Sequence, residues 1–345
     1  CALVRSRAQW WCHGYRLVVS GCPKDMVFGP CGGVTASHGC EVDGRPCPFC
    51  ERTEPMRWPT GAHQPAQRPQ PLDLPRVIVD FRPDPARPDE MRRAADALGA
   101  GDLAVLVGEH VDDLGHQPPH EMSHALRAVG LRPIVTVSGR DRSPVELDRE
   151  LDALVAAEPL AVHVVTGDHP AARFEPSATA RFVTDSMRLA DAVRRRGGRV
   201  SVAESPAAPP LGWRPTRLLD KQHAGADLAI VNHAGSLDLL AGFAAECRAI
   251  GVELPLVAPV PVVTDHRSAD SLSRFPGLVL PDGLLSLILG SSDPHRTGID
   301  LAVELGRRTL DSGWFAAVNL SGAATGDGVV ARAEVMAEIA ARILR

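Results

Sequence analysis

The chain has 345 residues, 44% of them hydrophobic and 23% charged, which is the composition of a globular protein and excludes a disordered or collagen-like chain. Its 37 basic and 42 acidic side chains give a formal net charge of −5, so the chain as a whole offers no basic field for nucleic acid or an anionic membrane surface. It has neither an apolar run long enough to cross a membrane nor an apolar leader near its start, and we expect a cytoplasmic protein with a small-molecule ligand.

Cysteine is concentrated at the start of the chain, since all cysteines except Cys247 lie within residues 1–50. Without an export signal, this density favours a metal site over a disulfide framework. The predicted ligands of a structural Zn²⁺ ion are Cys22, Cys31, Cys40 and Cys47, and the alternative ligands are Cys12, His38 and Cys50. Four thiolates also suit an iron–sulfur cluster, which is the alternative occupant. Because four protein ligands leave no open position for substrate, we expect the Cys-rich module (residues 1–50) to be structural.

A segment rich in Pro, Gln and Arg, residues 51–75, is predicted to link this module to a catalytic domain at 76–345. Eight short β-branched runs then predict strands at 76–81, 103–108, 133–138, 161–167, 199–204, 228–233, 254–263 and 315–322. Apolar residues at helical spacing predict helices between them, including 144–158, 178–198, 236–251 and 298–313. Eight such units in roughly 250 residues predict a (β/α)₈ TIM barrel, with an open doubly wound sheet as the alternative.

In such a barrel the loops after the strands form one mouth, where catalytic groups gather. Polar residues follow every predicted strand: Asp80, Arg82, Glu109, His110, Ser138, Arg140, Asp168, His169, Glu204, Ser205, Asn232, His233, Thr264, Asp265, Asn319 and Ser321. We expect the carboxylates of Asp80, Asp168 and Glu204 to repel one another, which would raise the pKa of at least one of them. The alternative for each is an ordinary helix cap or ion-pair partner.

Five segments carry a family resemblance in a fixed order: VIVDFRPDP (77–85), VVTGDHP (164–170), LLDKQHAGADLAIVN (218–232), PLVAPVPVVT (255–264) and GIDLAVELGRRTLDSG (298–313). Over residues 76–322 the chain resembles the methylenetetrahydrofolate reductase family. Residues 22–50, with the run GPCGG, resemble the Cys-rich module that accompanies such barrels. The resemblance implies a folate-binding TIM-barrel oxidoreductase.

Two departures from the family concern FAD, which its usual members bind. The loop after the fifth strand reads ESPAAP (204–209), without the family's tyrosine and histidine. On the next helix only Lys221 remains of the family's phosphate-binding residues, and Asp220 is expected to repel phosphate. FAD binding is therefore doubtful, and the chain most resembles the branch in which NADH or NADPH passes hydride directly to the folate, with Lys221 as the cofactor-binding residue.

The resemblance implies reduction of 5,10-methylenetetrahydrofolate to 5-methyltetrahydrofolate, in which Asp80 donates a proton and Asp168 stabilises the cation that forms. Asn232, Glu204 and Arg82 are the predicted substrate-binding residues; an amide suits the pterin edge, and a guanidinium suits a carboxylate. One alternative is a tetrahydrofolate-dependent methyl-transfer or demethylation protein without nicotinamide. Another is a non-catalytic barrel that partners a reductase or a corrinoid protein through the Cys-rich module.

Overall fold

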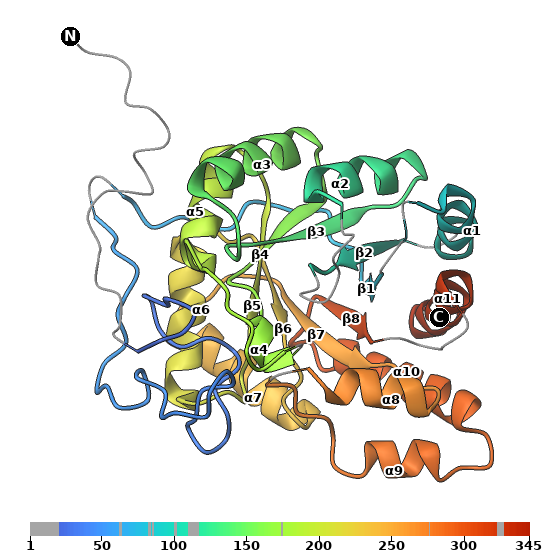
Figure 1. The fold of residues 1–345 in the computed structure, drawn as a ribbon. Helices are drawn as coiled ribbons and strands as arrows, with labels where there is room; N and C mark the ends of the chain where they lie inside the picture. The colour runs from blue at the N-terminus through green and yellow to red at the C-terminus, as the bar shows by residue number, and fades with distance from the viewer. Residues whose placement is uncertain are drawn as a thin grey trace.

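The computed structural model describes residues 21–61, 64–81, 84, 86–99, 102–109, 117–173, 175–275, 277–322 and 328–345. Eight strands in these ranges pair in parallel, in chain order, and close into a barrel (Figure 1). They are β1 (Val77–Asp80), β2 (Leu103–Val107), β3 (Pro133–Ser138), β4 (Ala161–Val165), β5 (Val200–Glu204), β6 (Leu228–Val231), β7 (Leu256–Pro261) and β8 (Ala317–Ser321). The predicted TIM barrel and its eight strands are confirmed, and each strand end lies within two residues of its predicted position.

Helices surround the barrel and separate consecutive strands (Figure 1). They are α1 (Pro88–Leu98), α2 (Pro119–Ala128), α3 (Pro144–Ala156), α4 (Pro170–Arg173), α5 (Ser186–Arg195), α6 (Arg214–His223), α7 (Leu237–Ala249), α8 (His266–Ser273), α9 (Leu284–Leu289), α10 (Pro294–Asp311) and α11 (Val329–Ile343). None of the helices in the described ranges is long and apolar enough to cross a membrane.

The strands are buried on both faces, which explains their continuous apolar sequences. One set of side chains fills the barrel interior: Ile78, Ala104, Ile134, Ala161, Leu228, Ile230, Val257 and Ala317. The opposite set packs against the helices. Leu72 and Leu74, just before β1, pack on the interior cluster, so the lower end of the barrel is filled and the open end is that of the strands' carboxyl termini.

Side-chain caps fix where some of the helices begin, among them α3 and α5. Ser143 and Glu146 form a reciprocal capping box at the start of α3. The helix predicted over 178–198 begins only at Ser186, because the side chain of Asp185 accepts a hydrogen bond from the backbone N–H of Arg188 and so fixes the first turn there.

The predicted linker lies against the outside of the barrel. Arg57 makes a bidentate ion pair with Asp220 of α6, at 2.8 to 3.0 Å. Further along, the backbone N–H of Gln70 donates to the Asp227 carboxylate at 2.7 Å. These contacts fix the segment on the barrel surface beside α5 and α6 (Figure 1).

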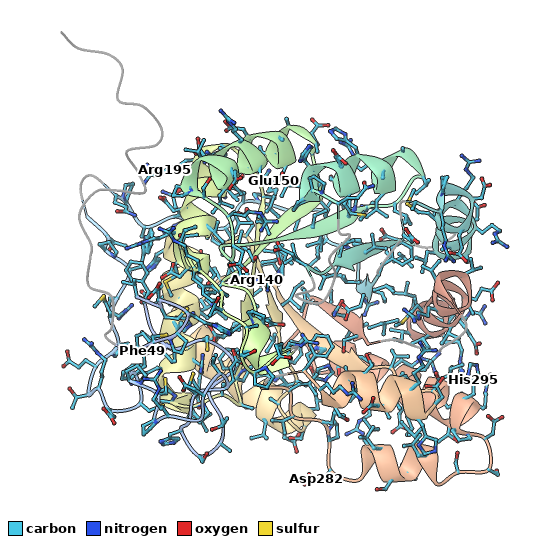
Figure 2. The ribbon with its side chains drawn as sticks, in the orientation of Figure 1. Phe49, Arg140, Glu150, Arg195, Asp282 and His295 are labelled. Atoms are coloured by element: carbon cyan, nitrogen blue, oxygen red, sulfur yellow. The ribbon has the colours of Figure 1, made fainter. Side chains whose placement is uncertain are left out.

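The described part of the Cys-rich module, residues 21–50, packs beside α6 (Figure 1). It contains short antiparallel bridges, such as Val34 with Cys40, and a small core in which Met26 and Phe49 are each 1% exposed. Figure 2 shows Phe49 on the side of the molecule where this module lies. Trp213, next to α6, packs against the same core, so this core is shared with the barrel.

Candidate active site

A cavity of about 600 Å³ opens at the carboxyl ends of the strands. Its wall combines residues from the barrel strands, from the loops after β4 and β5, from α8 and α11, and from the Cys-rich module. This is the end of a (β/α)₈ barrel at which its enzymes place their catalytic groups. Of the predicted site residues, Asp80, Asp168, Glu204, Lys221, Asn232 and Cys31 line this one cavity. Arg82 lies outside the described residues.

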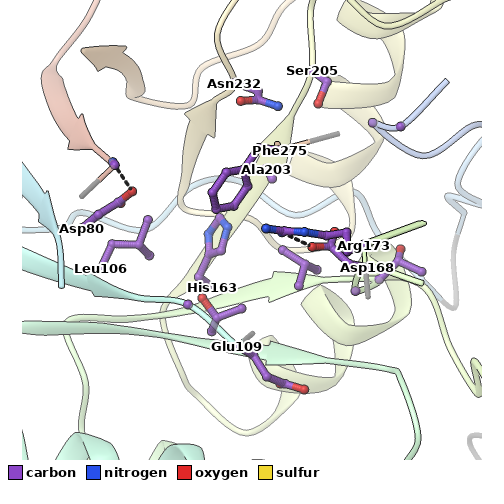
Figure 3. Close-up of a pocket in the computed structure, with 18 of the residues that line it drawn as sticks. Asp80, Leu106, Glu109, His163, Asp168, Arg173, Ala203, Ser205, Asn232 and Phe275 are labelled. Carbon is purple, nitrogen blue, oxygen red and sulfur yellow. Dashed lines mark hydrogen bonds and ion pairs between the residues drawn. The ribbon is translucent and has the colours of Figure 1, made fainter. Parts of the chain in front are cut away.

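Asp80 is the last residue of β1 and points into this cavity (Figure 3). Its Oδ1 accepts a hydrogen bond from Asn319 Nδ2 at 2.9 Å, and its Oδ2 accepts one from the backbone N–H of Gly322 at 3.2 Å. Burial raises the pKa of the Asp80 carboxyl to about 6, although both hydrogen bonds oppose the rise. Asp80 can therefore carry a proton close to neutral pH.

The expected repulsion among the three carboxylates is not the cause of that raised pKa. Burial would raise the pKa of Asp168, but Lys24, Arg173 and Arg140 lower it below its ordinary value. Arg173 Nη1 lies 2.7 Å from Asp168 Oδ2 (Figure 3). Cations also surround Glu204 and lower its pKa. Of the three predicted carboxylates, only Asp80 therefore has a raised pKa, and the cause is burial.

Glu204 ends β5 and is surrounded by three cations of α6. Lys221 Nζ lies 2.7 Å from Oε2, Arg214 Nη1 lies 3.2 Å from Oε1, and Arg217 Nε lies 3.6 Å from Oε2. Burial would raise the pKa of Glu204, but these cations lower it to about 2. Glu204 is thus a permanently ionised carboxylate that balances buried cations, and it is less free to contact substrate than the sequence suggested.

Lys221 lines the cavity, but its ammonium donates to Glu204 and to the backbone oxygen of Ala203. Burial lowers the pKa of Lys221 to about 8, although Glu204 opposes the change. The neighbouring Asp220 does not act as expected. Its carboxylate pairs with Arg57 of the linker and does not line the cavity, because α6 turns these adjacent residues to different sides. Asp220 therefore does not repel a phosphate in the cavity.

Asn232 follows β6 and lines the cavity (Figure 3). Its Oδ1 already accepts a hydrogen bond from the backbone N–H of His233 at 2.9 Å. The amide N–H groups can donate to a ligand, and the oxygen keeps a second lone pair. Asn232 can thus donate to an acceptor on a heterocycle at the cavity.

The Cys-rich module contributes a wall of the cavity, which the expectation of a purely structural role did not foresee. Lys24, Cys31, Gly32 and Glu41 line it. Gly32 lies so close to the β5 loop that a Cβ there would be 2.4 Å from Ser205 Oγ. Burial would lower the pKa of Lys24, but the charges of Cys31, Glu41 and Asp168 raise it, so this ammonium stays protonated beside the cavity.

Of the predicted zinc ligands, Cys22, Cys31 and Cys47 pack in the core around Met26, together with the alternative ligand Cys50. Cys40, the fourth predicted ligand, bridges Val34 of that core through its backbone, and the alternative ligand Cys12 lies outside the described residues. All the cysteines that the structure describes are free thiols. Burial raises the pKa of Cys22 and of Cys47 to about 11. In the described ranges, however, no three Cys, His, Asp or Glu side chains converge as metal ligands. The donor set as placed does not fit a metal ion, and zinc binding stays a prediction.

Metal analysis of purified protein tests that prediction. If the module binds Zn²⁺, wild-type protein should contain about one equivalent, and Cys31→Ser should lose it. Cys247→Ser is the matched control, since Cys247 is a buried thiol outside the module and should leave the metal content unchanged. Equal metal content in wild type and Cys31→Ser would contradict the predicted ligand set.

Arg173 and His163 are among the cavity residues that the sequence analysis did not single out. Arg173 of α4 pairs with Asp168 and lies over the Phe275 ring, 4.2 Å from its centre. His163 lies in the middle of β4, is 7% exposed, and reaches the cavity from the barrel interior (Figure 3). The sequence signal for His163 was a single imidazole in an otherwise apolar strand, which is more often a core histidine.

The fold and the site together define a (β/α)₈ barrel protein whose cavity, at the carboxyl ends of the strands, is lined by both charged and apolar side chains. The family model described as methylenetetrahydrofolate reductase matches residues 112–326, and the chain belongs to this family. The resemblance drawn from its barrel segments is thereby confirmed. Since the match begins after the Cys-rich module, it does not bear on the likeness proposed for residues 22–50. A search of curated proteins found no match.

Among solved structures, one from Clostridium thermocellum shares the fold with a TM-score of 0.58 and 11% identity, over 79% of this chain and 96% of that one. It is described as an uncharacterized protein that binds two copies of 5-methyl-5,6,7,8-tetrahydrofolic acid. A structure described as native KDPGal reaches a TM-score of 0.43 and 12% identity, over 80% and 95% of the two chains. At 11% identity, the likeness to the first structure shows a shared fold alone. The TM-score of the second structure is too low to show even that.

Proposed function

We propose that the protein reduces 5,10-methylenetetrahydrofolate to 5-methyltetrahydrofolate with NADH or NADPH and without a flavin. The observation that carries this proposal is Asp80, a buried carboxyl at the cavity whose pKa lies near 6 in a member of this reductase family. The folate bound by the Clostridium thermocellum neighbour supports a folate as the ligand.

The reaction needs a proton before it needs a hydride. Protonated Asp80 gives its proton to N10 as the bond between N10 and the bridging carbon breaks, which leaves a 5-iminium cation. Hydride from the nicotinamide then adds to the exocyclic methylene carbon and forms the methyl group. Asp80, now ionised, takes a proton from solvent, so each turnover consumes one hydride and one proton.

Asp168 supports the cationic intermediate by charge. Its lowered pKa keeps it ionised, and its side chain is still 38% exposed toward the cavity mouth, despite its pairing with Arg173. The N–H groups of Asn232 suit the acceptor atoms of the pterin.

The residues of α6 do not fit the phosphates of FAD, because they already bind protein acceptors. Arg214 donates to the backbone oxygens of Cys31 and Pro30, at 3.0 and 3.3 Å, and Arg217 donates to that of Phe28 at 2.7 Å. The Cys-rich module thus binds two of the α6 cations, Arg214 and Arg217, and both of them, together with Lys221, also surround Glu204. The diphosphate of FAD, or that of a nicotinamide cofactor, would therefore have to bind away from α6, and Asp220, which pairs with Arg57, plays no part in this.

The purified protein tests the proposal directly. We expect NADH or NADPH to be oxidised only when 5,10-methylenetetrahydrofolate is present, without added FAD, and the visible spectrum to show no flavin bands. Stoichiometric FAD in the purified protein would contradict the direct route. Methyl transfer without nicotinamide, or purification with a reductase or corrinoid protein but no turnover, would favour the alternative functions.

A further inference from the structure

His163 is a polar side chain in a barrel interior that is filled mainly by apolar ones. Its neighbours in register, Thr136 on β3 and Ser201 on β5, are small and polar, whereas the cluster beneath them is apolar. The imidazole points into the cavity, and in the view of Figure 3 it lies between Asp80 and Asp168. A histidine at this place forms part of the surface on which a ligand would rest.

One nitrogen of the imidazole is held by the protein. His163 Nδ1 lies 2.8 Å from Ser201 Oγ, and Ser201 is 0% exposed. Among the described residues, this is the one hydrogen bond of the Ser201 hydroxyl. A buried hydroxyl group needs an acceptor for its hydrogen, and His163 Nδ1 is the acceptor within reach. Nδ1 is then the acceptor, and Nε2 carries the hydrogen of the neutral ring.

The other nitrogen is available to a ligand. Nε2 has no hydrogen-bond partner among the described residues, and the side chain lines the cavity. Burial, together with the positive charge of Lys221, lowers the pKa of His163 to about 4, so the ring is uncharged near neutral pH. An uncharged N–H donor does not repel a cationic intermediate, which a protonated histidine would do.

We propose that His163 contacts the substrate directly, and that its Nε2–H donates a hydrogen bond to an acceptor on the heterocyclic ring at the cavity floor. The ligand class is a flat heterocycle with a ring nitrogen or carbonyl oxygen at its buried end, as in the pterin of a folate. This inference rests on the proposed function, since it takes the folate as ligand. Ser201 is then a positioning residue, which selects the tautomer of His163.

Binding of 5-methyltetrahydrofolate, measured by calorimetry on the full chain, tests the contact without relying on turnover. His163→Leu removes the donor and should raise Kd about tenfold, the loss expected for one hydrogen bond of this kind. His163→Gln places an amide N–H near the position of Nε2 and should restore affinity to within about threefold of wild type. In ¹⁵N spectra of histidine-labelled protein, the protonated nitrogen of His163 should be Nε2, and its signal should shift when the folate is added.

His233→Leu is the matched control. His233 is also buried, its Nε2 lies 2.6 Å from Ser321 Oγ, and its pKa is also about 4, but it does not line the cavity. It should lower stability like His163→Leu and leave Kd unchanged. Wild-type affinity in a folded His163→Leu would overturn the inference and leave the proposed function standing. Failure of the wild-type protein to bind the folate would instead overturn the proposed function.

Discussion

Asp80→Asn should lower turnover by roughly 10²–10⁴ and leave the Kd for 5-methyltetrahydrofolate close to that of wild type, because a positioned general acid contributes about this much. The amide keeps the size of the carboxyl and the acceptor for Asn319, but it cannot donate the required proton to N10. Steady-state rates and equilibrium binding, measured on the same preparations, separate the two effects. Unchanged turnover in Asp80→Asn would show that the proton comes from elsewhere.

The pH dependence of the rate gives a second signature of Asp80. The active form is the protonated carboxyl, and its pKa is raised from 3.8 to about 6, so turnover in wild type should fall as pH rises through about 6. This fall should be missing from the residual activity of Asp80→Asn. Asp102→Asn serves as a control, because Asp102 is an exposed carboxylate paired with Arg132 at the opposite end of the barrel and should change neither rate nor profile.

Glu204→Gln should lower the free energy of unfolding by about 3–5 kcal/mol near neutral pH, since removal of one partner leaves buried charges uncompensated. Glu204 is 1% exposed, and Arg214, Arg217 and Lys221 all depend on its charge. Urea unfolding measures the difference. Glu158→Gln is the control for an exposed ion pair, because the Glu158 side chain is 76% exposed beside Arg127, and it should cost less than about 1 kcal/mol.

The same carboxylate makes stability depend on pH in acid. The pKa of Glu204 is lowered from 4.5 to about 2 in the folded protein, so its contribution is fully present above about pH 4.5 and is lost as pH falls toward 2. The difference in stability between wild type and Glu204→Gln should therefore shrink over this range. A difference that stays constant from pH 6 down to about 2 would show that the charge of Glu204 is not what stabilises the cluster.

The barrel was predictable because its signals are local. A strand buried on both faces must be apolar throughout, and a helix packed on one face must repeat its apolar residues every three or four positions, so both patterns can be read along the chain. The place of Asp80 followed from the same logic, since a residue at the end of a barrel strand reaches the mouth. The family likewise followed from short segments in order, and the match over residues 112–326 confirms it.

The charges and neighbours at the mouth were decided by tertiary structure alone. Asp220 and Lys221 are adjacent in sequence, yet one pairs with Arg57 of the linker and the other with Glu204. Lys24 and His163 line the same cavity, although they are more than a hundred residues apart in the sequence. Their segments meet only after the chain has folded. The pKa of a carboxyl depends on burial and on charges within a few ångströms, and a sequence does not contain those distances. Composition and periodicity therefore determined the barrel and the end at which its polar residues gather, whereas the packing of the Cys-rich module on α6 determined which charges there are already paired.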